Sequence, residues 1–218
     1  LHQINSVGQL TIVTKLNNSP VKAGDAVSGM RCIPLLLDES EVEEANKIGR
    51  NNPILNIKPF IMKTMAIVTT GSEVATGRIK DAFMPIIEER TAPYGIKKIA
   101  HEIVIDDTQA IVEAIAKVKS TNPDIIFCTG GMSVDPDDLT PGAIAQYAEW
   151  VVTYGLPVLP GSMVCIAYCS DGTPIVGLPG GVLFSKPSAF DELLPRLAAR
   201  DEITKADCIA MGHGGFLG

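Results

Sequence analysis

The segment from Thr129 to Pro141, TGGMSVDPDDLTP, holds residue types that could bind a phosphate group. Gly130 and Gly131 would let backbone amides approach a ligand closely, as an anion-binding turn requires. Thr140 and Pro141 are residue types that open a helix, and a helix N-terminus favours a bound phosphate by about 0.3–1 kcal/mol. The sequence therefore predicts an anion site in this segment.

Three carboxylates, those of Asp135, Asp137 and Asp138, are crowded into the same segment. Negative charges beside a phosphate repel it and one another unless a cation lies between them. An oxygen-ligated ion such as Mg²⁺ suits this donor set, so these residues are candidate metal ligands. The alternative is a solvated acidic turn in which Asp138 caps the following helix.

A second candidate loop follows the apolar run Met65–Thr70. Thr70, Gly71, Ser72 and Glu73 would offer hydroxyl groups and backbone amides to a ligand at the end of a strand. An ordinary turn between a strand and a helix is the competing interpretation of this short TGSE pattern.

Two more positions lie at the ends of expected strands. In the GLPGG segment, Pro179 fixes a turn, and Gly180 and Gly181 allow close backbone approach before a helix expected to carry Lys186 and Ser188. Asp106 and Asp107 follow the expected strand 99–105. Helix capping is the alternative interpretation for this acidic pair, and a plain turn is the alternative for GLPGG.

The elements that must position these residues alternate between strand and helix from about Met62 to Arg200. Short apolar runs predict strands and longer amphipathic runs predict helices. Alternation of this kind is typical of a three-layer α/β fold, a mostly parallel sheet with helices on both faces, where ligands bind beyond the carboxyl ends of the strands. The expected strands are 65–70, 99–105, 124–129, 164–168 and 174–178, and the expected helices are 81–94, 108–120, one that opens at Pro141, and 188–199.

Residues 1–60 have a different pattern and predict a small β-rich segment. Thr11–Leu16 and the stretches GDAVSG and MRCIPLLL resemble strands, and Glu39–Gly49 is the one helical stretch. We therefore expect a β-rich segment over 1–60, an α/β domain over 61–200 and a C-terminal tail over 201–218. The chain begins at Leu1, as a piece of a longer protein would.

The composition of the chain limits the kinds of partner molecule that we expect it to bind. The formal net charge is −7 and aromatic residues make up 5% of the chain. The chain therefore has neither the positive charge that binds a nucleic-acid backbone nor the aromatic residues on which bases stack, and we expect no nucleic-acid partner.

The uncharged stretch Trp150–Ser170 contains Gly155, Pro157, Pro160 and Gly161, which break a helix, so we expect buried strands and no membrane span. Five cysteines without a CxxC motif predict buried thiols and a cytoplasmic location.

The motifs TTGSEVATGRIKD, IVIDDTQAI, TGGMSVDPDDLTP and GLPGG, in this order, resemble the molybdopterin-binding domain shared by molybdopterin adenylyltransferase, molybdopterin molybdotransferase and gephyrin. The resemblance covers roughly Lys63 to Arg200. It implies molybdopterin, a phosphorylated pterin, as ligand or substrate, and a homo-oligomer (trimer or dimer). It also implies catalytic roles for Asp107 and Asp138, and a ligand-lining role for Gly71, Gly130, Gly131 and Ser133.

Two departures from the family pattern leave the reaction open. Asp135 stands where the molybdotransferase loop usually has Gly, and the turn after GLP reads PGGV. The resemblance implies adenylyl transfer, with Mg²⁺ and possible use of ATP, or molybdate insertion. A non-catalytic carrier or sensor of molybdopterin is an alternative. The PDDLT stretch also resembles the competence-damage-inducible family, which implies nucleotide pyrophosphatase chemistry.

Overall fold

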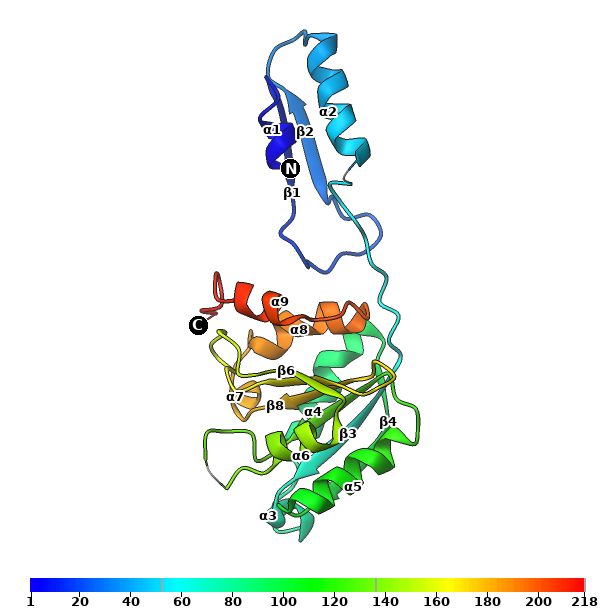
Figure 1. The fold of residues 1–218 in the computed structure, drawn as a ribbon, viewed down its shortest axis with the longest axis vertical. Coiled ribbons are helices and arrows are strands. Elements are labelled where there is room, and N and C mark those ends of the chain that lie inside the picture. Colours follow the sequence, from blue (N-terminus) through cyan, green and yellow to red (C-terminus); the bar gives the residue numbers. More distant parts are fainter. Residues whose placement is uncertain (52, 136, 218) are drawn as a thin grey trace. The chain divides into compact units, whose positions relative to one another are not determined.

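A computed structural model describes residues 1–51, 53–135 and 137–217 of the chain. The chain divides into two compact units, Leu1–Pro59 and Phe60–Gly218 (Figure 1). Each unit has its own hydrophobic core, so each is described by itself. None of the helices in the described ranges is long and apolar enough to cross a membrane.

The small unit contains a two-stranded antiparallel sheet and two helices. Strand β1 (Leu10–Thr14) pairs with β2 (Ser28–Cys32), and helices α1 (His2–Asn5) and α2 (Glu39–Asn51) accompany them. Ile4, Leu10 and Ala45 form its buried core. The expected strand at the start of the unit and the expected helix are present, but the strand expected in MRCIPLLL ends at Cys32. Pro34 gives the physical reason, since it has no N–H to donate to a sheet.

The large unit is built on one six-stranded sheet, and the expected α/β class is confirmed. The order across the sheet is β4 (Lys97–Val104), β3 (Thr64–Thr70), β5 (Ile125–Thr129), β8 (Pro174–Leu178), β7 (Cys165–Tyr168) and β6 (Trp150–Tyr154). The first four strands in this order run parallel to one another. Strand β7 pairs antiparallel with β8, and β6 pairs antiparallel with β7.

Helices cover both faces of this sheet, which confirms the three-layer prediction. Helices α5 (Thr108–Lys119) and α6 (Thr140–Tyr147) bury their apolar side chains on one face, and α4 (Phe83–Thr91) and α8 (Ala189–Ala198) bury theirs on the other (Figure 1). Successive side chains of β3 point to opposite faces of the sheet. Met65 and Ile67 therefore belong to one core cluster, and Ala66 and Val68 belong to the other.

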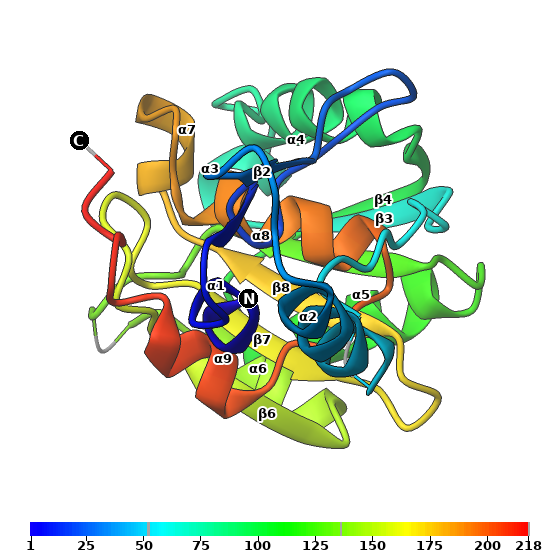
Figure 2. The same cartoon turned by 90° about the horizontal axis from the view of Figure 1, so that it is seen from above.

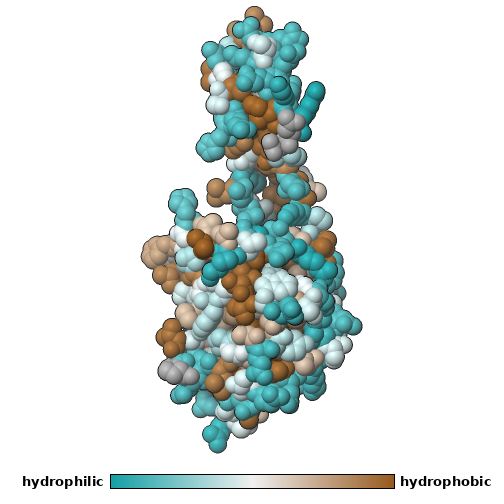
Figure 3. All heavy atoms as spheres, in the orientation of Figure 1, coloured by the Kyte–Doolittle hydropathy of each residue, from teal (hydrophilic) through white to brown (hydrophobic). Residues whose placement is uncertain are grey.

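Helix α8 lies over the middle of the sheet (Figure 2). Its Phe190 makes an edge-to-face contact with Phe127 of β5, with ring centroids 5.3 Å apart. Ser188 and Asp191 form a capping box at its start, although Ser188 was expected inside a helix. On the face shown in Figure 3, hydrophilic residues make up most of the surface of the large unit, with apolar residues in scattered groups.

Short elements that the sequence pattern did not predict follow two strands. Helix α3 (Ser72–Ala75) follows β3 and helix α7 (Gly181–Phe184) follows β8. The helix expected over 81–94 is divided into α4 and a 3₁₀ turn, η1 (Ala92–Tyr94). Because β3, β4, β5 and β8 are parallel, the loops after them meet at the same edge of the sheet.

The residues after 200 pack against the rest of the large unit. Helix α9 (Lys205–Ala210) begins with a capping box made by Thr204 and Asp207. Ile203 and Cys208 are buried in the same core cluster as α8. Leu159 and Phe216 form an isolated bridge, so the final residues have defined partners in this unit.

All five cysteines are free thiols, and four of them are buried. Cys128 lies on β5, Cys165 and Cys169 lie on and after β7, and Cys208 lies on α9. Burial raises the pKa of the Cys128 thiol and raises the pKa of Cys165 to about 12. These four confirm the prediction of buried thiols, whereas Cys32 on β2 is exposed.

Candidate functional site

The loop after β5 passes directly over the end of β3. Gly130 and Gly131 have positive φ angles of 84° and 51°, which residues other than glycine rarely adopt. A Cβ atom at Gly130 would overlap the carbonyl oxygen of Thr70, the last residue of β3. The absence of a Cβ atom at Gly130 therefore allows the loop to pass close to the end of the neighbouring strand β3.

Two buried threonines meet beside this loop. The hydroxyl oxygens of Thr70 and Thr140 are 3.0 Å apart, and Thr140 is the first residue of α6. A Cβ atom on Gly131 would lie 3.1 Å from the Thr140 hydroxyl and 3.6 Å from Oδ1 of Asp138. The structure thus brings Thr70, Gly131, Asp138 and Thr140 together at the start of a helix that opens with Pro at its second position.

Asp138 shapes the loop that precedes α6. Its Oδ2 accepts a hydrogen bond from the backbone N–H of Ser133 at 2.5 Å. The carbonyl of Ser133 accepts a second bond from the hydroxyl of Tyr154 at 2.7 Å. Burial raises the pKa of Tyr154, and the nearby Asp138 carboxylate raises it further. Tyr154 reaches this loop from β6, and the sequence pattern did not predict it because 21 residues separate it from Ser133.

The three acidic residues of the loop do not converge on one point. The side chain of Asp135 accepts a 3.4 Å bond from the N–H of Asp137, and its carbonyl accepts one from the N–H of Asp138. Among the residues that the structure describes, no group of three or more His, Cys, Asp or Glu side chains is arranged to hold a metal ion. In this conformation the predicted Mg²⁺ ligands therefore do not form a metal site.

The two acidic residues after β4, Asp106 and Asp107, make different contacts. Asp107 is the N-cap of α5, and its Oδ1 accepts a 2.8 Å bond from the N–H of Ala110. Asp106 instead faces the TGSE loop, where its Oδ2 accepts bonds from the N–H of Ser72 at 3.0 Å and from its hydroxyl at 3.4 Å. The structure therefore joins Asp106 to this loop and shows Asp107 in the capping role that was its alternative.

The rest of the TGSE loop is fixed by backbone contacts. Gly71 has a φ of 142° and donates its N–H to the carbonyl of Val104 on β4. The carbonyl of Glu73 accepts bonds from the N–H groups of Arg78 and Ile79, and the Glu73 side chain is exposed. These contacts hold the loop against β4.

The GLPGG turn lies next to the loop that contains Gly130 and Gly131. Thr129 of β5 is paired with Leu178 of β8, so Gly130 and Pro179 follow neighbouring strand ends. The carbonyl of Pro179 accepts a bond from the N–H of Val182 in α7, which begins at Gly181. Gly181 packs closely on Gly161. Lys186 lies between α7 and α8, although it was expected on a helix.

Arg90 of α4 holds the segment that follows GLPGG. Its guanidinium is buried and donates hydrogen bonds to the carbonyls of Val182 and Ser185 at 2.9 and 2.7 Å. It also donates to the hydroxyl of Ser188 and pairs with Asp191 at 2.9 Å. No sequence pattern pointed to Arg90, because its partners lie more than 90 residues further along the chain.

A second polar network lies on the opposite face of β3. Oδ2 of Asp81 accepts a 2.8 Å bond from the Thr69 hydroxyl and lies 3.3 Å from Nε2 of His101 on β4. Oδ1 of Asp81 accepts the N–H of Phe83 at the start of α4. Burial alone would raise the pKa of Asp81, but the bonds from His101, Thr69 and the backbone outweigh it and bring the pKa to about 2.

Comparison with known proteins gives one family for the chain. A family model described as "Probable molybdopterin binding domain" matches residues 66–199. A molybdopterin molybdenumtransferase from Staphylococcus epidermidis is 26% identical over 208 residues, covering 88% of this chain and 47% of that protein. A CinA-like protein from Amoebophilus asiaticus is 32% identical over 83 residues, covering 38% of this chain and 20% of that protein.

The fold agrees with a solved structure. The molybdopterin biosynthesis enzyme MoaB from Thermus thermophilus superposes with a TM-score of 0.55 at 22% identity, covering 66% of this chain and 99% of that one. Identity this low supports the fold alone. The chain spans less than half the length of the curated relatives named above. The family match covers most of the large unit and includes the four motifs, so the chain belongs to the probable molybdopterin binding domain family.

Proposed function

We propose that the large unit binds molybdopterin at the carboxyl ends of β3, β5 and β8. The observation that carries this proposal is the cluster of Thr70, Gly130, Gly131 and Thr140 at the start of α6. Hydroxyl groups, glycine amides and a helix N-terminus together suit the phosphate of the pterin. The family membership supports the pterin itself as the small-molecule partner.

In this proposal the surrounding loops form the walls of the pterin site. Ser72 and Glu73 flank the phosphate position on the β3 side, and Ser133 lies on the β5 side. Pro179, Gly180 and Gly181 close the β8 side, where the short side chains leave room for a flat ring. Arg90 does not touch the ligand and acts by holding the segment after Gly181.

The charged groups at the proposed site fit more than one reaction. Asp138, beside Gly131, would face a phosphate-linked group, and Asp107 would act from the start of α5. Mg²⁺ would offset the repulsion between these carboxylates and the ligand. Holding it would require Asp135, Asp137 and Asp138 to rearrange, since they do not converge in the described conformation. Adenylyl transfer from ATP and molybdate insertion both fit this charge arrangement, in which the protein positions phosphates and stabilises charge.

A second candidate function is nucleotide pyrophosphatase activity. Its support is the PDDLT stretch, whose resemblance to the competence-damage-inducible family implies this chemistry, together with CinA-like relatives, of which one is 35% identical over 82 residues. The same cluster around Thr140 would then bind the phosphates of a dinucleotide. A non-catalytic molybdopterin carrier is the remaining alternative, and it would share the binding site without turnover.

We also propose that the protein is cytoplasmic and forms a homo-oligomer through the β4 edge of the sheet. Four buried free thiols suit a reducing compartment. Strand β4 ends the sheet on one side, and Ile99 and Ile103 on it and Ile105 after it are 42–50% exposed. Burial of this apolar row against a second copy would remove it from water. Light scattering of the purified protein measures the oligomeric state directly.

The test of the binding proposal is calorimetric titration with molybdopterin. Thr140→Val removes one hydroxyl with little change in shape and should weaken binding about tenfold, because a hydrogen bond to a charged group contributes about 1.5–3 kcal/mol. Thr121→Val is the matched control, since the Thr121 hydroxyl bonds to the carbonyl of Val118 at the end of α5. Equal affinities for the two variants would contradict the proposed phosphate position.

Product analysis separates the reactions. The titrated mixture is repeated with and without Mg-ATP, with molybdate, and with a dinucleotide in place of the pterin. An adenylylated pterin supports adenylyl transfer, and a molybdenum-bearing pterin supports molybdate insertion. Binding without any product supports the carrier alternative. Release of mononucleotide without pterin binding would favour the pyrophosphatase.

A further inference from the structure

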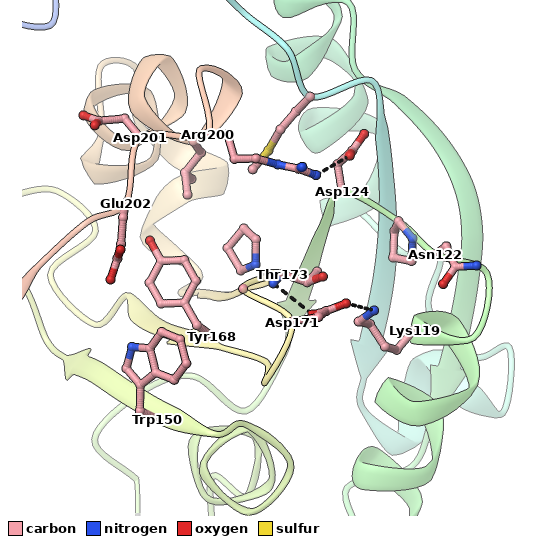
Figure 4. A pocket seen from close by; sticks show the side chains of 15 residues that line it. Lys119, Asn122, Asp124, Trp150, Tyr168, Asp171, Thr173, Arg200, Asp201 and Glu202 are labelled. Atoms are coloured by element: carbon pink, nitrogen blue, oxygen red, sulfur yellow. Dashed lines mark hydrogen bonds and ion pairs between the residues drawn. The ribbon is translucent and has the colours of Figure 1, made fainter.

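A cavity of about 490 Å³, drawn in Figure 4, opens at the amino ends of strands β5 and β8. The candidate pterin site lies at the carboxyl ends of the same strands. The cavity is lined by Asp124, which precedes β5, and by Pro174, the first residue of β8. Gly130 and Pro179 follow the other ends of these same two parallel strands. The cavity is therefore separate from the site discussed above, and its volume suits a small molecule.

One side of the cavity carries two ion pairs. Nζ of Lys119 lies 2.8 Å from Asp171, and a guanidinium nitrogen of Arg200 lies 2.6 Å from Asp124. The hydrogen bond from Lys119, with further bonds from Thr173, lowers the pKa of Asp171 to about 2. Both cations are thus already neutralised by carboxylates, so this side offers little attraction for an anionic ligand.

The other side of the cavity is aromatic. The rings of Trp150 and Tyr168 are stacked with centroids 5.4 Å apart and an interplanar angle of 25°. Tyr168 is buried, and its hydroxyl accepts a hydrogen bond from the N–H of Ile203 at 2.9 Å. Trp150 is 41% exposed and presents the accessible part of this stack. An exposed indole beside a cavity is the best aromatic partner for a cation.

An exposed carboxylate, that of Glu202, lies next to this stack. Glu202 is exposed and lines the cavity beside Tyr168 (Figure 4). Burial raises the pKa of Tyr168, and the negative charge of Glu202 raises it further. Within residues 1–51, 53–135 and 137–217 no cation pairs with the Glu202 side chain. The neighbouring Asp201, by contrast, pairs with Arg196 at 2.8 Å.

We propose that this cavity binds a small organic cation, an amine or guanidinium compound, with the charged group beside the stacked rings of Trp150 and Tyr168 and near Glu202. The aromatic stack supplies the attraction of a ring face for a cation, and Glu202 supplies the counter-charge. The two neutral ion pairs form the polar far side, where further donors of the ligand can reach Asp171 and Thr173. This inference concerns a different edge of the sheet and does not depend on the proposed pterin binding.

The chain contains a single tryptophan, so its fluorescence reports on this cavity directly. The full chain is titrated with agmatine, which carries a guanidinium and an ammonium group, at constant ionic strength. We expect a saturable change in Trp150 emission with agmatine and none with glutarate, an anion of similar length. A blocked Gly-Arg-Gly tripeptide, titrated in parallel, separates a small-molecule site from a site for a protein side chain, and we expect it to bind more weakly than agmatine.

Calorimetry on two variants locates the binding. Glu202→Gln should weaken agmatine binding about three- to fivefold, the size expected for one partly exposed charge pair. Glu192→Gln on α8 removes an exposed carboxylate that does not line the cavity and should bind as the unmodified chain does. The proposal is overturned if agmatine gives no saturable change, if glutarate or the tripeptide binds more tightly, or if both variants bind alike.

Discussion

At the scale of single residues, the candidate site depends on backbone conformations that side chains would prevent. Gly130 turns with a positive φ while its α-carbon lies against the carbonyl of Thr70. Gly131 leaves space beside it for the Thr140 hydroxyl and the Asp138 carboxylate. The backbone conformation at these positions therefore depends on the absence of a Cβ atom, and small changes there should be destabilising.

Gly130→Ala should destabilise the large unit by about 1–3 kcal/mol, because the new Cβ overlaps the Thr70 carbonyl and the φ angle is unfavourable for alanine. Gly142→Ala is the matched control. Gly142 lies inside α6 with open space around its α-carbon, so alanine there should stabilise the protein by about 0.5–1 kcal/mol. Urea unfolding measures both changes, and a destabilised Gly142→Ala variant would contradict this comparison.

Some of these residues were predictable from the sequence and others were not, for a clear reason. Gly130, Thr140 and Asp138 lie in one segment, so their types and spacing alone indicate an anion site. Tyr154 and Arg90 reach the same region from distant elements, and local pattern carries no information about such contacts. The pair Asp106 and Asp107 was found as a pair, but only the structure shows which one faces Ser72.

At the scale of elements, single buried polar side chains connect β3, β4 and the helices around them. Asp81 joins the end of β3 to β4 through Thr69 and His101, and it also accepts the N–H groups of the first two residues of α4. The Asp81 side chain is only 6% exposed. Its negative charge is stabilised by several donors at once, so its ionisation is linked to folding.

Asp81 should make stability depend on pH in the acid range. Its folded pKa, about 2, lies below its ordinary value of 3.8. Its contribution of about 2 kcal/mol is therefore fully present above about pH 5, and it is lost as pH falls below 3.8 and through the folded pKa of about 2. Asp81→Asn should be less stable than the unmodified chain at pH 7, and the gap should narrow below about pH 4 and close only below about pH 2. Urea titrations at several pH values measure the gap, and a gap that stays constant as the pH falls would contradict this assignment.

Arg90 should hold the segment between β8 and α8 in place. Arg90→Met leaves the carbonyls of Val182 and Ser185 without their buried donor and should cost about 3 kcal/mol. It should also weaken ligand binding, because this segment follows the GLPGG turn. Thermal unfolding and pterin titration measure the two effects. Arg31→Met in the small unit is the control, since the Arg31 side chain is exposed, and a similar loss there would contradict the assignment.

Long elements with a clear period were predicted, and short ones were not. The strands and helices of the large unit follow apolar runs that the sequence shows plainly. Helices α3 and α7 have four residues each, too few for a helical period to show. Strand β6 was expected to be buried with its neighbours, but it lies at the sheet edge and Trp150, Val151 and Tyr154 are exposed. Edge position is a property of topology, which the local pattern does not contain.

At the scale of the whole molecule, the two units differ in how much core each one has. The large unit has two extensive core clusters, one on each face of its sheet. The core cluster of the small unit has three buried apolar residues, Ile4, Leu10 and Ala45. Leu35 and Leu36 in that unit are fully or almost fully exposed. A core this small contributes little stability to an isolated segment of about 60 residues.

The large unit should therefore fold without the small one. A fragment of residues 60–218 should unfold cooperatively within about 5 °C of the main transition of the full chain. A fragment of residues 1–59 should show little or no cooperative transition. Circular dichroism melts of both fragments and the full chain measure this. A large fall in the midpoint for residues 60–218 would mean that the small unit contributes to the core of the large one.

Because one cysteine is exposed and four are buried, the rate at which each thiol is labelled measures how often the structure around it opens. A thiol-reactive dye added to the native chain should modify Cys32 within the mixing time, because it is exposed on β2. Cys128, Cys165, Cys169 and Cys208 can react only when the sheet or α9 separates from its neighbours. The slow labelling of these four, resolved by mass spectrometry, would give an opening rate for each layer of the large unit without any substitution.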